Sequence, residues 1–236
     1  MKKVSAVIAI TLMLTSCQKF IDKIYEKDPI AKLCKLKSIK TIGQYDTYFQ
    51  TFHNNKWGEP DSITYANPGT GTPSLYFIYD KKGRLIEHTN GDVGTHRYVY
   101  EPNSTMPVRD TLLDYYTNIF VSRYTYDQKG RIIKLVVDWQ GSDLPEQPRE
   151  DYEIIYEYNE HGNLVKAGPI NYGPYDDKVN LLRTSKVLQF IYRDYSLNNR
   201  GTATKYNKNG LPVLYDYSAT PKTSPFLRQE IEYTCK

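Results

Sequence analysis

Hydrophobic and polar residues alternate in short runs along most of the chain, which is the pattern of half-buried β-strands. From Lys35 onward these runs are rich in tyrosine, isoleucine, valine and threonine, and asparagine, glycine and proline separate them. We count about fourteen candidate strands and no segment with the length and period of an ordinary helix. The pattern predicts an all-β fold, an antiparallel hairpin meander that forms a large twisted and curved sheet or an open barrel.

Four of the predicted turns share a motif in which Asp or Asn stands three residues before Gly. The first side chain of such a turn bonds to the backbone, and the glycine takes the left-handed conformation of a three-residue hairpin loop. The turn pairs are Asp80 and Gly83, Asp127 and Gly130, Asn159 and Gly162, and Asn207 and Gly210. This geometry predicts cross-strand pairs of tyrosine with an aliphatic residue: Tyr79 with Leu85, Tyr126 with Ile132, and Tyr158 with Leu164. In the fourth copy Pro212 faces Tyr206, which predicts a sheet edge or a bulge.

The motif copies, most closely those at residues 77–85 and 124–132, resemble the tyrosine-aspartate repeats of the Rhs family, whose core reads Tyr-x-Tyr-Asp-x-x-Gly-Arg-Leu. In that family many tandem copies wind into a large shell around a toxin. Here the four glycines lie 47, 32 and 48 residues apart, so the chain is too short to enclose a cargo domain. As a whole it resembles small lipoproteins of Bacteroidetes-type bacteria that carry a few such hairpins. The resemblance implies a fold and a compartment and no catalytic residue.

The N-terminus has a different pattern, in which Lys2 and Lys3 precede an uncharged apolar run over residues 4–14. The run is too short to span a bilayer, and small residues lead from it to Cys17. This order resembles a bacterial lipoprotein signal, which implies removal of residues 1–16 and acylation of Cys17. The alternative is an ordinary secreted protein. We therefore expect a tether over residues 17–33, a single domain over residues 34–236, and a lipid-anchored protein of the bacterial cell envelope, on the periplasmic or surface face of the outer membrane.

Two cysteines remain once Cys17 is acylated, and they stand at the two ends of the domain. An oxidising envelope favours a disulfide between Cys34 and Cys235, and closing a loop of about 200 residues contributes up to about 5 kcal/mol in the chain-entropy model. The bridge would place a strand near residues 36–42 beside one near residues 227–234. The alternative is a pair of buried free thiols.

The charge of the chain argues against nucleic acid as a partner. The sequence has 31 Lys and Arg against 27 Asp and Glu, and removal of Lys2 and Lys3 leaves 29 basic side chains. The mature protein is therefore close to neutral, and its basic residues form no long run.

Catalytic and metal-binding patterns are weak, so we predict no catalytic residue, no metal and no cofactor. The sequence has no nucleophile elbow, zinc-protease motif, phosphate loop or paired cysteine knuckles. His88 and His96 flank Asp92, and a hairpin there would place the two rings opposite each other. We interpret them as a solvated pair on an exposed hairpin rather than as metal ligands. The same register pairs Glu87 with Arg97.

Two long polar stretches, residues 139–150 and 166–184, are expected to be ordered loops, the usual place for binding sites on a β scaffold. Trp139, Tyr172 and Tyr175 are the candidate contact residues, although packing onto the sheet is the simpler explanation for aromatic side chains. Most of the 23 tyrosines alternate within strands, which predicts cross-strand packing with hydroxyls that reach water.

These observations favour a non-enzymatic binding or assembly module whose partners are a membrane, through the lipid anchor, and an envelope protein or polysaccharide. The alternatives are a glycan-binding or glycan-processing accessory protein and, from the repeat resemblance alone, an immunity-like protein paired with a toxin.

Overall fold

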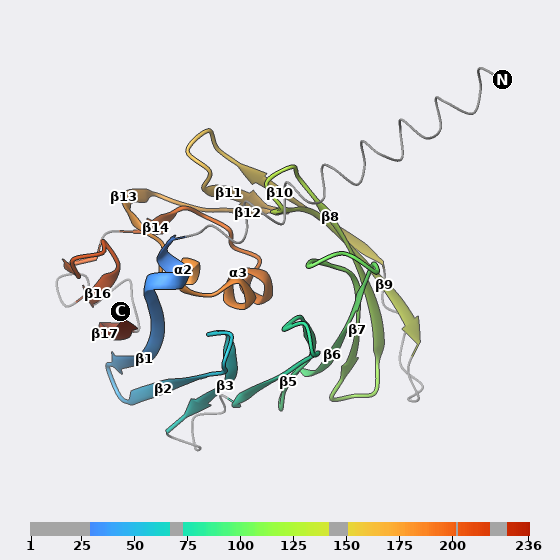
Figure 1. The fold of residues 1–236 in the computed structure, drawn as a ribbon, viewed down its shortest axis with the longest axis horizontal. Coiled ribbons are helices and arrows are strands. Elements are labelled where there is room, and N and C mark those ends of the chain that lie inside the picture. Colours follow the sequence, from blue (N-terminus) through green and yellow to red (C-terminus); the bar gives the residue numbers. More distant parts are fainter. Residues whose placement is uncertain (1–28, 67–72, 142–150, 202, 218–225) are drawn as a thin grey trace.

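Fifteen antiparallel strands form one curled sheet, which Figure 1 shows in the computed structural model of the protein. The structure describes residues 29–66, 73–141, 151–201, 203–217 and 226–236. The strands are β1 (Cys34–Gly43), β2 (Thr47–Asn54), β3 (Pro60–Tyr65), β4 (Leu75–Tyr79), β5 (Leu85–Asn90), β6 (Gly94–Tyr100), β7 (Pro107–Asp114), β8 (Ile119–Tyr126), β9 (Ile132–Gly141), β10 (Tyr152–Tyr158), β11 (Leu164–Ala167), β12 (Ile170–Asn171), β13 (Tyr175–Val179), β14 (Asn198–Arg200), β15 (Lys205–Tyr206), β16 (Pro212–Asp216) and β17 (Phe226–Cys235). The order in the large sheet is β12-β11-β10-β9-β8-β7-β6-β5-β4-β3-β2-β1-β17-β16-β15. The predicted all-β meander is confirmed.

The sheet curls around its own interior without closing, and its two edges are β12 and β15. A separate ribbon of β13 and β14 lies between these edges. On one side the Tyr175 hydroxyl donates to the Leu164 carbonyl over 2.5 Å, and on the other the Val179 N–H donates to the Gly210 carbonyl over 3.1 Å. The ribbon therefore links β11, next to one edge of the sheet, to the turn between β15 and β16 at the other edge.

Three short helices were not expected from the sequence: α2 (Pro29–Leu33), the 3-10 helix η1 (Leu181–Thr184) and α3 (Lys186–Tyr192). Figure 1 shows α3 inside the curl. Ser185 caps α3, because its hydroxyl oxygen accepts the Leu188 N–H over 3.1 Å and its O–H donates to Glu59. The prediction that residues 166–184 form a loop was wrong, since β12, β13 and η1 lie within them. A helix of seven residues is too short to show a periodic pattern, and the enclosing sheet stabilises it.

Helix α3 joins two hydrophobic clusters on the concave face of the sheet. One cluster includes Phe52, Ile63 and Phe77 on the early strands, and Leu188 of α3 packs within it. The other is centred on Ile132, Leu135 and Leu164. Phe190 of α3 packs against both. The helix therefore fills the space that a curled sheet of this size leaves between its inner faces.

The four predicted turns form as the motif indicates. In the first, the Asp80 carboxylate accepts the backbone N–H groups of Lys82 and Arg84 over 2.8 and 2.9 Å, and Gly83 has a φ of +79°. The predicted pairs Tyr79 with Leu85, Tyr126 with Ile132 and Tyr158 with Leu164 are all present. A register shift accompanies each copy, including the Tyr206 and Pro212 pair, which lies between the edge strand β15 and its neighbour β16. The motif therefore sets the register as well as the reversal of direction.

Two further turns of the same kind were missed in the sequence. Asn55 accepts the Trp57 and Glu59 N–H groups and leads to Gly58, whose φ is +77°. Asp114 accepts the Tyr116 and Asn118 N–H groups, but Thr117 stands in the glycine position with a φ of 65°. The Asn and Gly spacing was a usable signal for the first turn, whereas a threonine in the left-handed region gives no such signal.

Five of these turns, those beginning at Asn55, Asp80, Asp127, Asn159 and Asn207, lie along one edge of the meander, which we call the turn edge. Along it, tyrosine hydroxyls donate to the carbonyl of the first residue of a neighbouring strand. These pairs are Tyr79 with Pro60, Tyr100 with Leu85, Tyr126 with Pro107, Tyr158 with Ile132, and Tyr233 with Pro212. Arg84 and Arg131 stack on the rings of Tyr100 and Tyr158. The expectation that the tyrosine hydroxyls reach water was wrong at these positions, because they connect one strand to the next.

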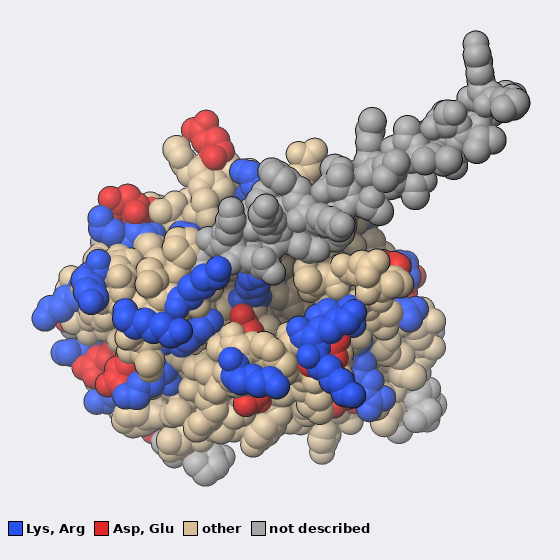
Figure 2. Space-filling model, viewed as in Figure 1, with Lys and Arg blue, Asp and Glu red and all other residues tan. Residues whose placement is uncertain are grey.

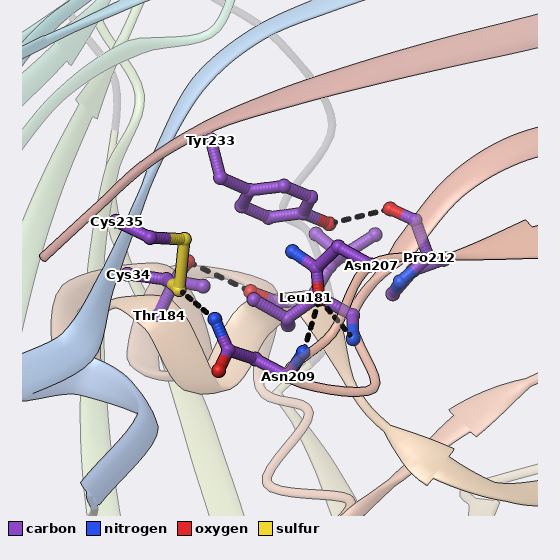
Figure 3. Close-up of a disulfide and its surroundings, with 9 residues drawn as sticks. Cys34, Leu181, Thr184, Asn207, Asn209, Pro212, Tyr233 and Cys235 are labelled. Atoms are coloured by element: carbon purple, nitrogen blue, oxygen red, sulfur yellow. Dashed lines mark hydrogen bonds between the residues drawn. A yellow bond between two sulfur atoms is a disulfide. The ribbon is translucent and has the colours of Figure 1, made fainter.

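The predicted disulfide between Cys34 and Cys235 is present and joins β1 to β17 at the turn edge (Figure 3). The Asn209 side-chain amide of the fourth turn donates to Cys34 Sγ over 3.1 Å. Cys34 is fully buried, with Ile30 of α2 and Leu211 packed in the same small cluster. The bridge therefore ties both ends of the described chain into the sheet.

Candidate ligand cavity and the polar cluster beside it

The concave face of β5 to β8 carries a cluster of buried polar side chains. His88 and His96 stand opposite each other as predicted, with stacked rings whose centroids are 4.5 Å apart. His96 Nδ1 lies 2.5 Å from an Asp110 carboxylate oxygen, and the Tyr124 hydroxyl donates to the other oxygen over 2.5 Å. The Tyr98 hydroxyl lies 2.7 Å from His88 Nδ1. The expectation of a solvated pair on an exposed hairpin was wrong, because the sheet curls with both histidines on its inner face and buries His88.

Burial determines the charge state of His88, and hydrogen bonds determine that of Asp110. Burial, with the nearby His96, lowers the pKa of His88 to about 3, so its ring is neutral at physiological pH. Burial alone would raise the pKa of Asp110, but hydrogen bonds from His96, Tyr124 and Ser122 outweigh it and hold the pKa below the usual range. Asp110 is thus a fully buried carboxylate whose charge is stabilised by three side-chain donors.

Arg193 follows directly after α3. It interacts electrostatically with this cluster and also lines a cavity in the protein. Its backbone is left-handed, with φ 53° and ψ 31°, a conformation that usually requires glycine at a helix C-terminus. Its guanidinium donates to the Tyr156 hydroxyl and lies within the electrostatic influence of Asp110 and Tyr124. A non-glycine residue in this conformation costs free energy, so the surroundings must hold it there.

This cavity has a volume of about 730 Å³ and lies on the inner side of the curl, partly open to solvent, between β10 to β12 on one side and β1, β2, β16 and β17 on the other. We call it the interior cavity. Aliphatic and phenylalanine side chains from β1, β2, η1 and α3 line one part of it, among them Leu36, Phe52, Leu182 and Leu188. Five tyrosines also line it: Tyr156, Tyr172, Tyr192, Tyr215 and Tyr217. Its volume is in the range typical of small-molecule sites, about 300–1,000 Å³.

Two arginines and one acidic residue line the same cavity. Arg200 on β14 stacks over the Tyr172 ring, with its guanidinium carbon 5.3 Å from the ring centroid. Arg193 and Asp194, which are adjacent in the sequence, also line the cavity. Asp194 accepts the Ser196 N–H over 2.9 Å. Neither arginine forms an ion pair with any residue that the structure describes. The lining therefore carries a net positive charge.

The three predicted contact residues do not form one surface. Tyr172 lines the cavity, whereas Tyr175 and Trp139 are not part of its lining. Tyr175 uses its hydroxyl to connect β13 to β11. Trp139 lies within β9 rather than in a loop, and its ring N–H points at Asn118 over 3.4 Å. The packing explanation therefore describes Trp139 and Tyr175. Tyr172 packs against the cluster around Ile132 and also lines the cavity, and its contact with a ligand stays a prediction.

Arg193, Arg200 and Asp110 were missed because isolated charged residues within strands or short loops have no local pattern. They meet only after segments far apart in the sequence come together. Cys17 and the proposed signal and tether fall outside the described residues, apart from residues 29–33. Within the described part of the chain no group of three or more His, Cys, Asp or Glu side chains could hold a metal ion. No helix there is long and apolar enough to cross a membrane.

The outer charges are distributed rather than concentrated. Figure 2 shows Lys and Arg side chains spread over one face of the molecule with Asp and Glu between them. Several are paired across strands, as in Lys37 with Glu232 and the predicted pair Arg97 with Glu87, each at 2.9 Å. The face in Figure 2 therefore carries charges of both signs.

Comparisons with known proteins give little beyond this description. No protein-family model matches the chain, and no curated protein matches it. Among solved structures, a chain of the Photorhabdus luminescens Tc holotoxin pore is similar over 51% of this chain and 6% of that chain, with 18% identity and a TM-score of 0.32. An overall likeness this small bears on neither the family nor the activity of the chain.

Proposed function

We propose that this protein is a non-enzymatic binding module, held in the bacterial cell envelope by a lipid on Cys17, that takes a small ligand into its interior cavity. The observation that carries the proposal is the cavity itself, about 730 Å³ lined by apolar and aromatic side chains with a few charged ones. Sites with this combination of volume and lining are typical of ligand binding.

The envelope location is supported by two features of the chain. The order of residues around Cys17 is that of a lipoprotein signal, and the disulfide between Cys34 and Cys235 fits an oxidising compartment. Acyl chains on Cys17 would contribute about 0.8 kcal/mol per buried methylene, enough together for a stable anchor.

Binding is favoured over catalysis by the way the polar cluster is bonded. The Asp110 carboxylate accepts hydrogen bonds from His96, Tyr124 and Ser122, and Tyr98 bonds His88. These groups satisfy one another, and Phe190 covers the rings of Tyr98 and Tyr124 at 5.2 and 5.3 Å. The cluster interacts electrostatically with Arg193, and none of its own side chains lines the cavity.

A glycan ligand is the second candidate, and one observation favours it. Tyr215 and Tyr217 have parallel rings 6.0 Å apart beside Asn199 and Gln229 on the cavity wall. Aromatic faces next to amide side chains suit sugar rings with their hydroxyl groups.

The experiment for the binding function is native mass spectrometry of the full protein, purified from envelope membranes in mild detergent. We expect a bound small molecule that is lost when Ile170→Trp narrows the cavity and kept in Ile155→Trp. Ile170 lines the cavity and Ile155 does not, while both are exposed positions on strands of the same sheet. A folded wild-type protein without any bound species, which also binds no member of a metabolite or oligosaccharide library, would overturn the proposal.

The anchor has a separate test in cells. Labelled palmitate should be incorporated into the wild-type protein, and Cys17→Ala should abolish the label and release the protein from membranes. Cys34 and Cys235 are bonded to each other, so neither offers a competing thiol. A wild-type protein that stays unlabelled and soluble would contradict lipidation.

A further inference from the structure

We propose that the ligand of the interior cavity is an amphipathic organic anion, whose carboxylate, sulfonate or phosphate group is held between Arg193 and Arg200. This inference rests on the proposed binding function and adds the chemical class of the ligand. It depends on the state of the two arginines, on the lining around them and on the shape of the apolar part of the cavity.

Arg193 is a half-buried cation that the protein holds at a cost. Its backbone occupies the left-handed region, and its guanidinium donates to the Tyr156 hydroxyl without an ion pair to any described residue. Asp110, the nearest buried carboxylate in the cluster, is itself engaged by His96 and Tyr124. A guanidinium has five N–H donors, so Arg193 retains donors for an anion that enters the cavity.

Arg200 supplies a second cation with a fixed orientation. Its guanidinium lies over the Tyr172 ring, and stacking of this kind leaves the N–H edge available for an oxyanion. It too has no ion pair with a described residue. Asp194 is the acidic residue among the cavity-lining side chains, and it already accepts the Ser196 N–H. Two cations face one acid, which favours a ligand with a negative charge.

The rest of the cavity selects for an apolar body. Leu36, Ile39, Phe52, Leu181 and Leu188 line it from β1, β2, η1 and α3. Water against such side chains is readily displaced by an apolar group, at a gain of about 25 cal/mol per Å². A small inorganic anion would leave this surface wet, and a neutral lipid would leave both arginines unpaired. An organic anion with an apolar body satisfies both parts.

The test uses two fluorescent probes that differ by one charged group: anilinonaphthalene sulfonate and its uncharged parent, phenylnaphthylamine. We expect the wild-type protein to bind the sulfonate about tenfold more tightly than the parent, or roughly 1.4 kcal/mol. Arg193→Gln and Arg200→Gln should each weaken the sulfonate about tenfold and leave the parent unchanged. Arg109→Gln, at an exposed position on β7 that does not line the cavity, is the matched control and should change neither.

The outcomes separate this inference from the binding function. Ile170→Trp should reduce the binding of both probes if they occupy the cavity. Cavity binding of both probes with equal affinity, unaffected by either arginine variant, would overturn the anionic class and leave the binding function standing. If Ile170→Trp changes the binding of neither probe, the result would count against both the anionic ligand class and the binding function. Should Arg193→Gln fail to fold, Arg200→Gln decides the question, because Arg200 is exposed.

Discussion

The turn edge and the interior of this protein are built by different kinds of contact. At the turn edge each Asp or Asn bonds within four residues of itself, as Asp127 does with Lys129 and Arg131. In the interior, Asp110 bonds His96 and Tyr124 from the two neighbouring strands, and Arg193, the residue after α3, interacts electrostatically with that cluster. The side-chain bonds that close the turns repeat along the chain, whereas the buried cluster around Asp110 occurs once.

The difference has an energetic consequence. A turn side chain at the surface can be replaced by a similar one, because water and the backbone offer alternative partners. A buried charge such as Asp110 has no such alternative once one of its donors is removed. We therefore expect the interior to be less tolerant of conservative substitutions than the turn edge, and the following predictions test that contrast.

The largest effect is expected from the disulfide, the one contact of the turn edge that is covalent and that no alternative hydrogen-bond partner can replace. The disulfide between Cys34 and Cys235 spans a sequence separation of 201 residues, and the chain-entropy model gives about 5 kcal/mol for a loop of this length. The double variant Cys34→Ala with Cys235→Ala should lower the free energy of unfolding by about 3–5 kcal/mol in urea titrations. Wild-type protein treated with a reductant is the control, and it should lose a similar amount. Equal stability of the oxidised protein and the double variant would contradict this assignment.

The same substitution at two aspartates compares the regions directly. Asp110→Asn should cost about 3 kcal/mol, because an amide cannot accept all three hydrogen bonds in the buried cluster and places a donor there. Asp127→Asn should cost about 0.5–1 kcal/mol, since Asn159 and Asn207 hold the equivalent turns through the same backbone bonds. Thermal and urea unfolding of both variants measures the ratio. Similar losses at the two positions would contradict the contrast.

The interior should also make stability depend on pH. The pKa of His88 is lowered to about 3 in the folded protein, against about 6.5 when unfolded. Below pH 6.5 the unfolded chain therefore binds more protons than the folded one, and stability falls as the pH falls. Between pH 6.5 and pH 4.5 we expect His88 to contribute a loss of about 2 kcal/mol. Denaturant titrations across this window should show a shallower slope for His88→Gln, with His161→Gln, at an exposed turn, as the control. An unchanged slope in His88→Gln would show that the group is not buried as described.

The smallest expected change in the free energy of unfolding comes from the left-handed position of two turns, where one has Thr117 and the other Gly130. Thr117 occupies the left-handed position with a φ of 65°, and its hydroxyl is buried with no hydrogen-bond partner among the residues that the structure describes. Thr117→Gly should raise the free energy of unfolding by about 1 kcal/mol, because glycine adopts this conformation without strain. Gly130→Ala, at a φ of 73° in another turn, should lower it by about the same amount. Changes of the same sign in the two variants would contradict the turn geometry.

The sequence by itself determined the all-β character of this protein, four of its hairpin turns and the pair of cysteines that form its disulfide. The Asp or Asn to Gly spacing predicted Tyr79 opposite Leu85, since a turn of known geometry sets the register of its flanking strands. With Cys17 assigned to a lipid, Cys34 and Cys235 were the remaining cysteines, and the disulfide predicted from them, with buried free thiols as the alternative, is present. These features depend on neighbours in the chain or on a single pair of residues.

Only the tertiary structure decided the curl of the sheet, the helix within it and the cavity. His88 and His96 were predicted to face each other, but the side of the sheet on which they lie depends on which face the curl encloses. Arg193, Arg200 and Tyr172 meet because β10 to β14 return to the strands near both chain ends. A site assembled from segments that far apart leaves no periodic or spaced pattern in the sequence, because each of its residues is constrained only by neighbours that the fold supplies.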